Sequence, residues 1–551
     1  MKALTVLIDE QNKFENEKVF FGKSALEACS SFFEVAEFLP ASIENGGVDI
    51  IKKADLQTVT QMLAKIYQLA GEKKADFVVL CYADLPFVNK ELTKRLVKTH
   101  VEYKCEYTFA DGFPYGLAPE LIDTGALGIL VELSKTNSAD EGSKNFERGS
   151  LYNLIKTDIN SFDVEAELSD TDWRLLRFNL SCANKDSFLQ CKNTFEAVKD
   201  WGEALSLYDA EKLCKVASEC PGVLKTVPGF YNIQICTELD TKPVYEPCEA
   251  EAQTSKAKLP PSELDMPPSG ADVKPSAQPV PPYGTDVRTA AMSLERFGLL
   301  CKKISGLSQN AVLNLGFLCE PLCHKDFLLL VKEVFKYEGL SVFFETSALA
   351  ASEDFCQSLC QIVQEAGAAA NGYQRLMVAV RLDAVSKETF AKVNGADQAD
   401  FDMVLAGCDR LCKSLPGMVY PQFTRMNQNE GELEAFYRYW NEKSNPSGGN
   451  CIIQKYNDYS GVLPACKPAD LSPLERDVCW HLRRDMTILC DGACVLCPNM
   501  NFSDEREILG NAFEDDLGEI WKKTDSAILN HINNNYCECC RKCDEYYTFN
   551  F

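Results

Sequence analysis

Apolar and polar positions alternate along the chain with two different periods. Segments 3–8, 76–83 and 125–133 are short, nearly continuous apolar runs, which predict buried β-strands. Residues 55–74 instead repeat apolar side chains three and four positions apart, as an amphipathic helix does, and this helix is expected to end near Gly71. The mixture predicts an α/β domain over residues 1–185, followed by a helical connector over 186–227.

A more regular alternation begins at residue 228. Strands are predicted over 231–236, 311–318, 340–348, 375–385, 418–427 and 450–458, each separated from the next by a helix-like segment. Strands joined by helical crossovers form a parallel sheet, either open and doubly wound or closed into a barrel. This unit is expected over residues 228–475. Residues 249–285 interrupt it with a Pro-, Ser- and Ala-rich stretch that predicts a disordered insert.

Composition and charge then limit the classes of function. The 551 residues are enough for two to four domains. The 81 acidic against 56 basic side chains give a formal charge of −25, which argues against a nucleic-acid partner. No apolar stretch approaches the roughly twenty residues of a membrane span, and the first residues lack the parts of a signal peptide. We therefore expect a soluble, cytoplasmic protein with no membrane partner.

Cysteine is concentrated near the end of the chain, where eight of the 26 cysteines lie within residues 479–543. Disulfides, a zinc ion and an iron–sulfur cluster are the three centres that such clustering allows. Disulfides are rare in a reducing compartment, whereas four thiolates from distant segments suit zinc or a cluster. The gap between the cysteine groups is about twice that of a zinc ribbon, which favours the cluster.

The order of motifs in this segment resembles the SPASM or shorter twitch domain that follows the barrel of many radical SAM proteins. The matching parts are Cys479, DGACVLC (491–497), LGN (509–511), LGEIW (517–521) and CRKC (540–543). The resemblance covers residues 476–551 and implies one [4Fe-4S] cluster. Its implied ligands are Cys479, Cys497, Cys540 and Cys543, with Cys494 and Cys537 in reserve and Cys490 and Cys539 as free thiols. Such tails in relatives often help to present a peptide or protein substrate.

The six-stranded unit resembles a radical SAM partial barrel in layout. GFLCEPLCHKDF (316–327) and AVRLDAVSKETFAKVNG (379–395) resemble stretches that approach S-adenosylmethionine (SAM), which implies a cofactor pocket at Gly316, Glu320, Pro321 and Asp383. The family's C-x3-C-x2-C motif is missing, because the loop after the first strand offers only Cys236 and Cys248. Either the barrel has lost SAM cleavage, or an unusual ligand set borrows Cys319 or Cys323 and the protein is an active radical SAM enzyme that modifies a peptide or protein.

The N-terminal domain places ADLP (83–86) between a buried strand and a helix, which resembles the nucleotidyltransferase and glycosyltransferase-A fold. The resemblance implies that Asp84 holds a divalent metal, although the family's Gly-rich phosphate loop is absent. In its whole order the chain resembles the spiro-SPASM family: a nucleotidyltransferase-like domain, a degenerate radical SAM barrel and a SPASM tail. We therefore expect an iron–sulfur protein with a degenerate SAM site. A nucleotidyl or glycosyl transferase acting through Asp84 is the alternative.

Overall fold

The computed structural model divides the chain into two compact units, Met1–Thr226 and Val227–Phe551. The structure describes residues 1–11, 14–56, 58–136, 145–202, 204–247, 291–369, 373–469, 472–473, 476, 478–502 and 506–547. The predicted insert 249–285 and Cys248 lie outside the described residues. Within the described ranges, no helix combines the length and the apolar character needed to cross a membrane.

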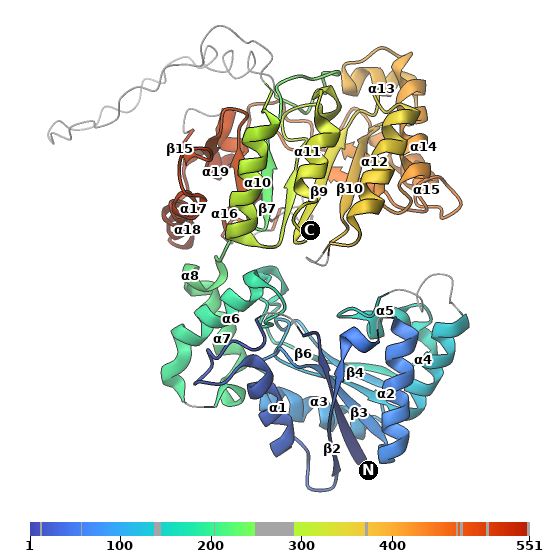
Figure 1. Cartoon of the computed structure of the whole chain (residues 1–551), viewed down its shortest axis with the longest axis vertical. Helices are drawn as coiled ribbons and strands as arrows, with labels where there is room; N and C mark the ends of the chain where they lie inside the picture. Colours follow the sequence, from blue (N-terminus) through green and yellow to red (C-terminus); the bar gives the residue numbers. More distant parts are fainter. Residues whose placement is uncertain are drawn as a thin grey trace, which may run out of the picture. The chain divides into compact units, whose positions relative to one another are not determined.

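The first unit is built on a six-stranded mixed sheet (Figure 1). Its strands are β1 (Lys2–Asp9), β2 (Glu44–Lys52), β3 (Phe77–Tyr82), β4 (Tyr107–Asp111), β5 (Glu120–Asp123) and β6 (Val164–Leu168), in the spatial order β2-β1-β3-β5-β4-β6. β1 runs parallel to β2 and β3, whereas β5 is antiparallel to both of its neighbours. Every residue of β3 is buried, as expected for the central strand of a sheet covered on both faces.

The helices of this unit are α1 (Ala25–Val35), α2 (Val59–Lys73), α3 (Lys90–Glu102), α4 (Thr124–Thr136), α5 (Ser150–Lys156), α6 (Lys185–Val198), α7 (Ala210–Glu219) and α8 (Pro221–Leu224). α2 confirms the helix predicted over 55–74. Thr58 and Gln61 form a capping box at its start, and Lys74 closes its end in the left-handed conformation.

The strand predicted over 125–133 is wrong, because these residues belong to helix α4. Ala126, Leu127, Leu130 and Val131 are buried, whereas Ile129 between them is 54% exposed. This spacing marks one face of a helix, and that face packs against α2. A short apolar run suits a buried helix as well as a strand, so its composition alone could not separate the two.

The helical segment expected as a connector belongs to the first unit. α6, α7 and α8 pack against one another, and their apolar faces share a core with Phe20 and Phe87 from the sheet domain. Cys191 of α6 and Leu213 of α7 are buried in that core. Burying these faces stabilises the unit, which explains why this helical segment folds onto the sheet domain.

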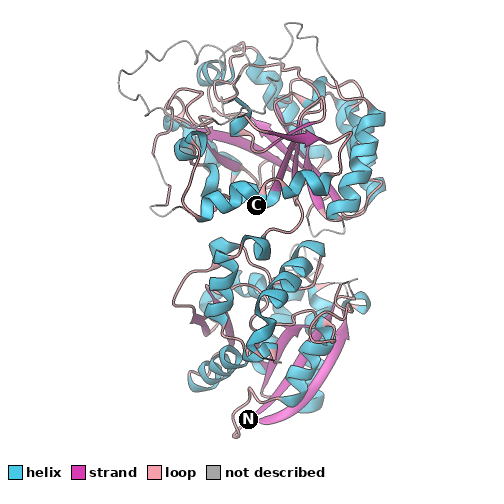
Figure 2. Ribbon diagram, turned by 90° about the vertical axis from the view of Figure 1, so that its left-hand side faces the viewer, coloured by secondary structure: helices cyan, strands magenta, loops and turns pink. Residues whose placement is uncertain are grey.

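The second unit contains a nine-stranded sheet (Figure 2). Its strands are β7 (Phe230–Ile233), β8 (Ala311–Asn314), β9 (Leu340–Thr346), β10 (Leu376–Arg381), β11 (Val419–Arg425), β12 (Ile452–Lys455), β13 (Asp485–Ile488), β14 (Ala493–Val495) and β15 (Ile508–Asn511). β7 to β12 are all parallel and adjacent in chain order, which confirms the six predicted strands. β13 adds to β7 in parallel, and β14 and β15 continue the sheet antiparallel.

The helices of the second unit are α10 (Leu294–Ser308), α11 (Phe327–Val334), α12 (Glu353–Ala366), α13 (Lys387–Asn394), α14 (Asp400–Ser414), α15 (Leu433–Trp440), α16 (Trp480–Arg484), α17 (Leu517–Lys522), α18 (Asp525–Ile532) and α19 (Glu538–Lys542). α10, α11, α12 and α14 pack side by side in this order over the strands (Figure 1). The carboxyl ends of six parallel strands therefore meet at one edge, where α/β folds place their ligands.

Candidate functional site

The cysteine-rich tail is positioned by the three strands that extend the sheet. β13 and β14 are joined by a tight turn in which the amide of Gly492 donates to the carbonyl of Leu489 at 2.8 Å. Gly492 has φ +90°, and a Cβ there would lie 2.4 Å from the ring of Phe513. Only glycine fits this turn. β14 then carries the chain to Cys497, and α19 carries Cys540.

Four cysteines from three separate segments meet beside these elements. Cys479 precedes α16, Cys497 follows β14, and Cys540 and Cys543 lie in and just after α19. Burial raises the pKa of the Cys497 thiol well above its usual range, and the neighbouring thiols of Cys543, Cys479 and Cys540 raise it further. Burial, with Cys479 next, raises the pKa of Cys543 to about 12. Cys479, Cys540 and Cys543 are therefore near enough to Cys497 for their charges to affect its thiol.

Hydrogen-bond donors surround these thiols. The side-chain amide of buried Asn499 and the backbone amide of Glu545 each donate to Cys543 Sγ at 3.3 Å. Arg476 donates to the carbonyl of Cys540 at 2.6 Å and lies over the Tyr546 ring at 4.3 Å. Amide donors to sulfur and a nearby cation stabilise thiolates, which are the form that binds metal.

The other tail cysteines lie differently. Cys537 caps α19 and accepts a hydrogen bond from the amide of Cys540 at 3.4 Å, so it borders the four thiols. Cys494 is fully buried in the main apolar core of the second unit and contacts the carbonyl of Gly492. Cys539 is buried beside Ser460. Cys537 is therefore the better placed of the two reserve ligands.

The predicted pocket residues line the carboxyl edge of the parallel strands. Gly316 lies so close to β9 that a Cβ would stand 2.8 Å from the amide of Glu345. Glu320, just before Pro321, is fully buried and accepts hydrogen bonds from Thr346 Oγ1 at 2.6 Å and the Ser347 amide at 2.9 Å. Its carboxylate also pairs with Arg381 at 3.0 Å.

Asp383 is equally buried, and it has the unusual φ of 58°. It accepts hydrogen bonds from the amide of Thr424 and from the hydroxyl of Tyr245, both at 2.6 Å. The sequence reasoning missed Arg381 and Tyr245. Arg381 had a usable signal, because a charged residue ends an otherwise apolar strand.

A second group of thiols lies near this edge. Cys236 and Cys319 are buried in direct side-chain contact, and this hydrogen bond lowers the pKa of Cys236 against the effect of burial. Cys490 lies beside the carbonyl of Ile235, and burial followed by the Cys236 thiol raises its pKa to about 11. Cys323 is half-buried. Cys490, expected as a free thiol, thus has a thiol neighbour.

In the first unit, Asp84 follows β3 and is only 1% exposed. Its Oδ2 accepts a hydrogen bond from Arg148 Nη2 at 2.8 Å, and the same nitrogen contacts Glu10 at 2.5 Å. Lys53 adds a second cation on Glu10 at 2.8 Å. The Arg148 guanidinium also lies 4.3 Å over the Tyr82 ring. Asp84 is therefore paired with a cation that the chain itself supplies.

Within the described part of the chain, no group of three or more His, Cys, Asp or Glu side chains is close enough together to hold a single metal ion. This holds for the carboxylates around Asp84 and for both groups of thiols.

Comparison with known proteins identifies a long relative. An uncharacterized protein of Treponema pallidum (strain Nichols) is 33% identical over 405 residues, which are 73% of this chain and 98% of the relative. The chain belongs to the family of this treponemal protein. The similarity covers most of the chain, but the name of the relative does not indicate a reaction.

The tail of this treponemal-family member also matches a general domain model. Residues 479–544 match SPASM, an iron-sulfur cluster-binding domain. The match contains the four converging cysteines. The tail is therefore a SPASM domain, which confirms the predicted domain type and the iron–sulfur class of cofactor.

Solved structures resemble the family member over large parts of its length. Streptococcus suis SuiB bound to the precursor peptide SuiA covers 69% of this chain and 88% of its own, with 12% identity and a TM-score of 0.39. A cytidylyltransferase from Leptospira borgpetersenii serovar Hardjo-bovis covers 40% of this chain and 96% of its own, with 10% identity and a TM-score of 0.32.

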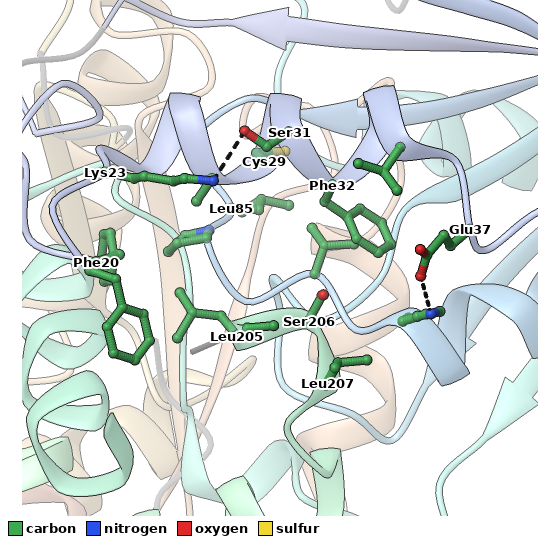
Figure 3. A pocket seen from close by; sticks show the side chains of 17 residues that line it. Phe20, Lys23, Cys29, Ser31, Phe32, Glu37, Leu85, Leu205, Ser206 and Leu207 are labelled. Atoms are coloured by element: carbon green, nitrogen blue, oxygen red, sulfur yellow. Dashed lines mark hydrogen bonds and ion pairs between the residues drawn. The ribbon is translucent and has the colours of Figure 1, made fainter. Parts of the chain in front are cut away.

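The first unit of this family member also contains a cavity of about 300 Å³ (Figure 3). Phe20, Phe32, Leu85 and Leu205 give it an apolar lining, and Lys23 reaches across its rim to Ser31. None of the predicted site residues lines this cavity.

Proposed function

We propose that the protein holds one [4Fe-4S] cluster on Cys479, Cys497, Cys540 and Cys543. The observation that carries this proposal is the convergence of these four thiols, from three segments, inside the SPASM domain. When bound, the cluster supplies one-electron chemistry and cross-links the small strands and helices of the tail. The chain's own contribution is to bury the thiols and to aim the amides of Asn499 and Glu545 at Cys543.

Iron is favoured over zinc by the match of residues 479–544 to an iron-sulfur cluster-binding domain, which contains all four cysteines. The gap between the two cysteine groups, about twice that of a zinc ribbon, points the same way.

Anaerobic reconstitution of the full chain with iron and sulfide tests the proposal. About four irons per chain are expected, together with the visible absorption of a cluster. The Cys479→Ala, Cys497→Ala double variant should lose most of this iron. Cys494→Ala is the matched control, because Cys494 is a buried cysteine of the same domain that packs into the main core. Stoichiometric zinc without iron uptake would contradict the proposal.

We also infer that the six parallel strands no longer support SAM cleavage. The inference rests on the missing C-x3-C-x2-C motif, because three thiolates in one loop are needed to leave an iron open for SAM. Gly316, Glu320, Pro321 and Asp383 then form the remnant of a cofactor pocket. The contrary reading, an active enzyme that uses Cys236 with Cys319, predicts SAM-dependent chemistry in the reduced protein.

Transfer of a nucleotide or sugar through Asp84 is the less favoured function, because Arg148 already pairs with this carboxylate. The SPASM resemblance predicts that the tail binds a peptide or protein partner. Affinity capture with the full chain and with a Cys479→Ala, Cys497→Ala chain tests this prediction. Identical partners from both chains would remove the cluster domain from the docking role.

A further inference from the structure

The loop after β7 is anchored across the carboxyl edge of the parallel strands. The amide of Lys242 donates to the carbonyl of Asn394 at 3.0 Å, and the amide of Val244 donates to the carbonyl of Val393 at 2.9 Å, which fixes one side to the end of α13. On the other side, the amide of Glu320 donates to the carbonyl of Glu238 at 2.8 Å. The loop is thus held at both sides by backbone hydrogen bonds.

Side chains of this loop reach the predicted pocket residues. The Tyr245 hydroxyl donates to Asp383 at 2.6 Å, and the Glu246 carboxylate pairs with Arg381 at 3.0 Å. Nearer the start of the loop, Asp240 accepts a hydrogen bond from the Ser347 hydroxyl at 2.5 Å. The ends of two adjacent strands, β9 and β10, therefore each receive a polar contact from one loop.

Arg381 is a buried cation whose charge is balanced in part by the loop. Its guanidinium is 4% exposed and lies between two carboxylates, Glu320 from the loop after β8 and Glu246 from the loop after β7. A buried cation requires such partners, because it has lost its hydration. Glu246 thus acts as a counterion that the chain itself supplies.

A glycine permits the close approach of the loop to α13. Gly395 follows α13 with φ +57°, and a Cβ at this position would lie 2.3 Å from the carbonyl oxygen of Lys242. Any larger residue would push the loop away from the helix end. Gly417 provides a matched comparison, since it has a similar φ of +77° and nothing within 4 Å of a Cβ.

We propose that residues 237–247 form an internal plug, an autoinhibitory contact that closes the carboxyl edge of the six strands to a nucleoside ligand such as SAM. The proposal rests on the inferred remnant pocket and gives a physical reason for its inactivity beyond the missing cysteines. Tyr245 occupies the predicted pocket residue Asp383, and Glu246 occupies Arg381 two positions before it. Withdrawal of the plug opens the edge.

Two variants of the full chain test the plug. Tyr245→Ala with Glu246→Ala removes the side chains that fill the edge, and Gly395→Ala displaces the loop from α13. Both should speed amide hydrogen exchange in residues 237–247 by about tenfold or more and should create SAM binding, measured by calorimetry, that the wild type lacks. Gly417→Ala should behave like the wild type in both measurements.

Either of two results would overturn the plug. In the first, the wild type binds SAM while the loop amides stay protected. In the second, a folded variant with fast-exchanging loop amides still binds no SAM. If one variant fails to fold, as judged by circular dichroism, the other decides. Iron content measured on the same samples keeps this test separate from the cluster proposal, because the plug predicts unchanged iron in every variant.

Discussion

Replacing Arg148 by Met tests whether Asp84 is structural or a metal ligand. The substitution keeps an unbranched side chain over the Tyr82 ring but removes the cation from two carboxylates. Glu10 keeps its partner Lys53 at 2.8 Å and is partly open to water. Asp84 is 1% exposed and loses its ion pair with the guanidinium. The cost therefore falls mainly on Asp84.

The expected loss of stability is large. Removing one partner of a buried ion pair costs about 3–5 kcal/mol, because the remaining charge stays desolvated. Asp84→Asn in the Arg148→Met background removes that charge and should recover a substantial part of the loss. Arg174→Met is the matched control, since the pairs of Arg174 with Asp111 and Asp172 lie on the surface, and it should change stability little.

Hydrogen exchange of peptides from β1 and β3 during urea titration of the full chain is the appropriate assay, because it isolates the first unit from the second. Mg²⁺ should leave these exchange rates unchanged in the wild type, since a bound ion would stabilise the unit. The reasoning fails if Arg148→Met costs no more than Arg174→Met, or if Mg²⁺ protects the wild type.

Three further predictions follow from other sites. Burial lowers the pKa of His100 to about 4 from 6.5, so its neutral form stabilises the first unit. The contribution of His100 to the free energy of unfolding is fully present above pH 6.5 and falls by about 3 kcal/mol as the pH drops towards 4. His100→Gln should flatten the pH–stability curve over this range. Reduced, reconstituted protein should form no 5′-deoxyadenosine from SAM, and formation that disappears in Cys236→Ala would reveal a catalytic cluster. Asn499→Ala removes an N–H···S bond to Cys543 and should lower the cluster's reduction potential in voltammetry, whereas an unchanged or higher potential would contradict the assigned role.

The sequence by itself determined the elements whose periodicity is unambiguous. The six strands of the second unit and helix α2 appear where the pattern places them, because long apolar repeats permit one buried face. The tail was also recognisable from sequence, since a tight Gly492 turn and closely spaced cysteines leave local signals. Segment 125–133 failed as a strand because a short apolar run is compatible with both periods.

Tertiary structure alone decided which distant groups meet. Arg148 lies in no motif, yet it reaches Asp84 from 64 residues away and pairs with the carboxylate that the motif assigned to a metal. Glu246 is separated from Arg381 by 135 residues, and Cys497 from Cys543 by 46, so no local period links either pair. Local patterns report which face of an element is buried. Partners across a sheet edge depend on how whole elements pack, and only the folded chain contains that information.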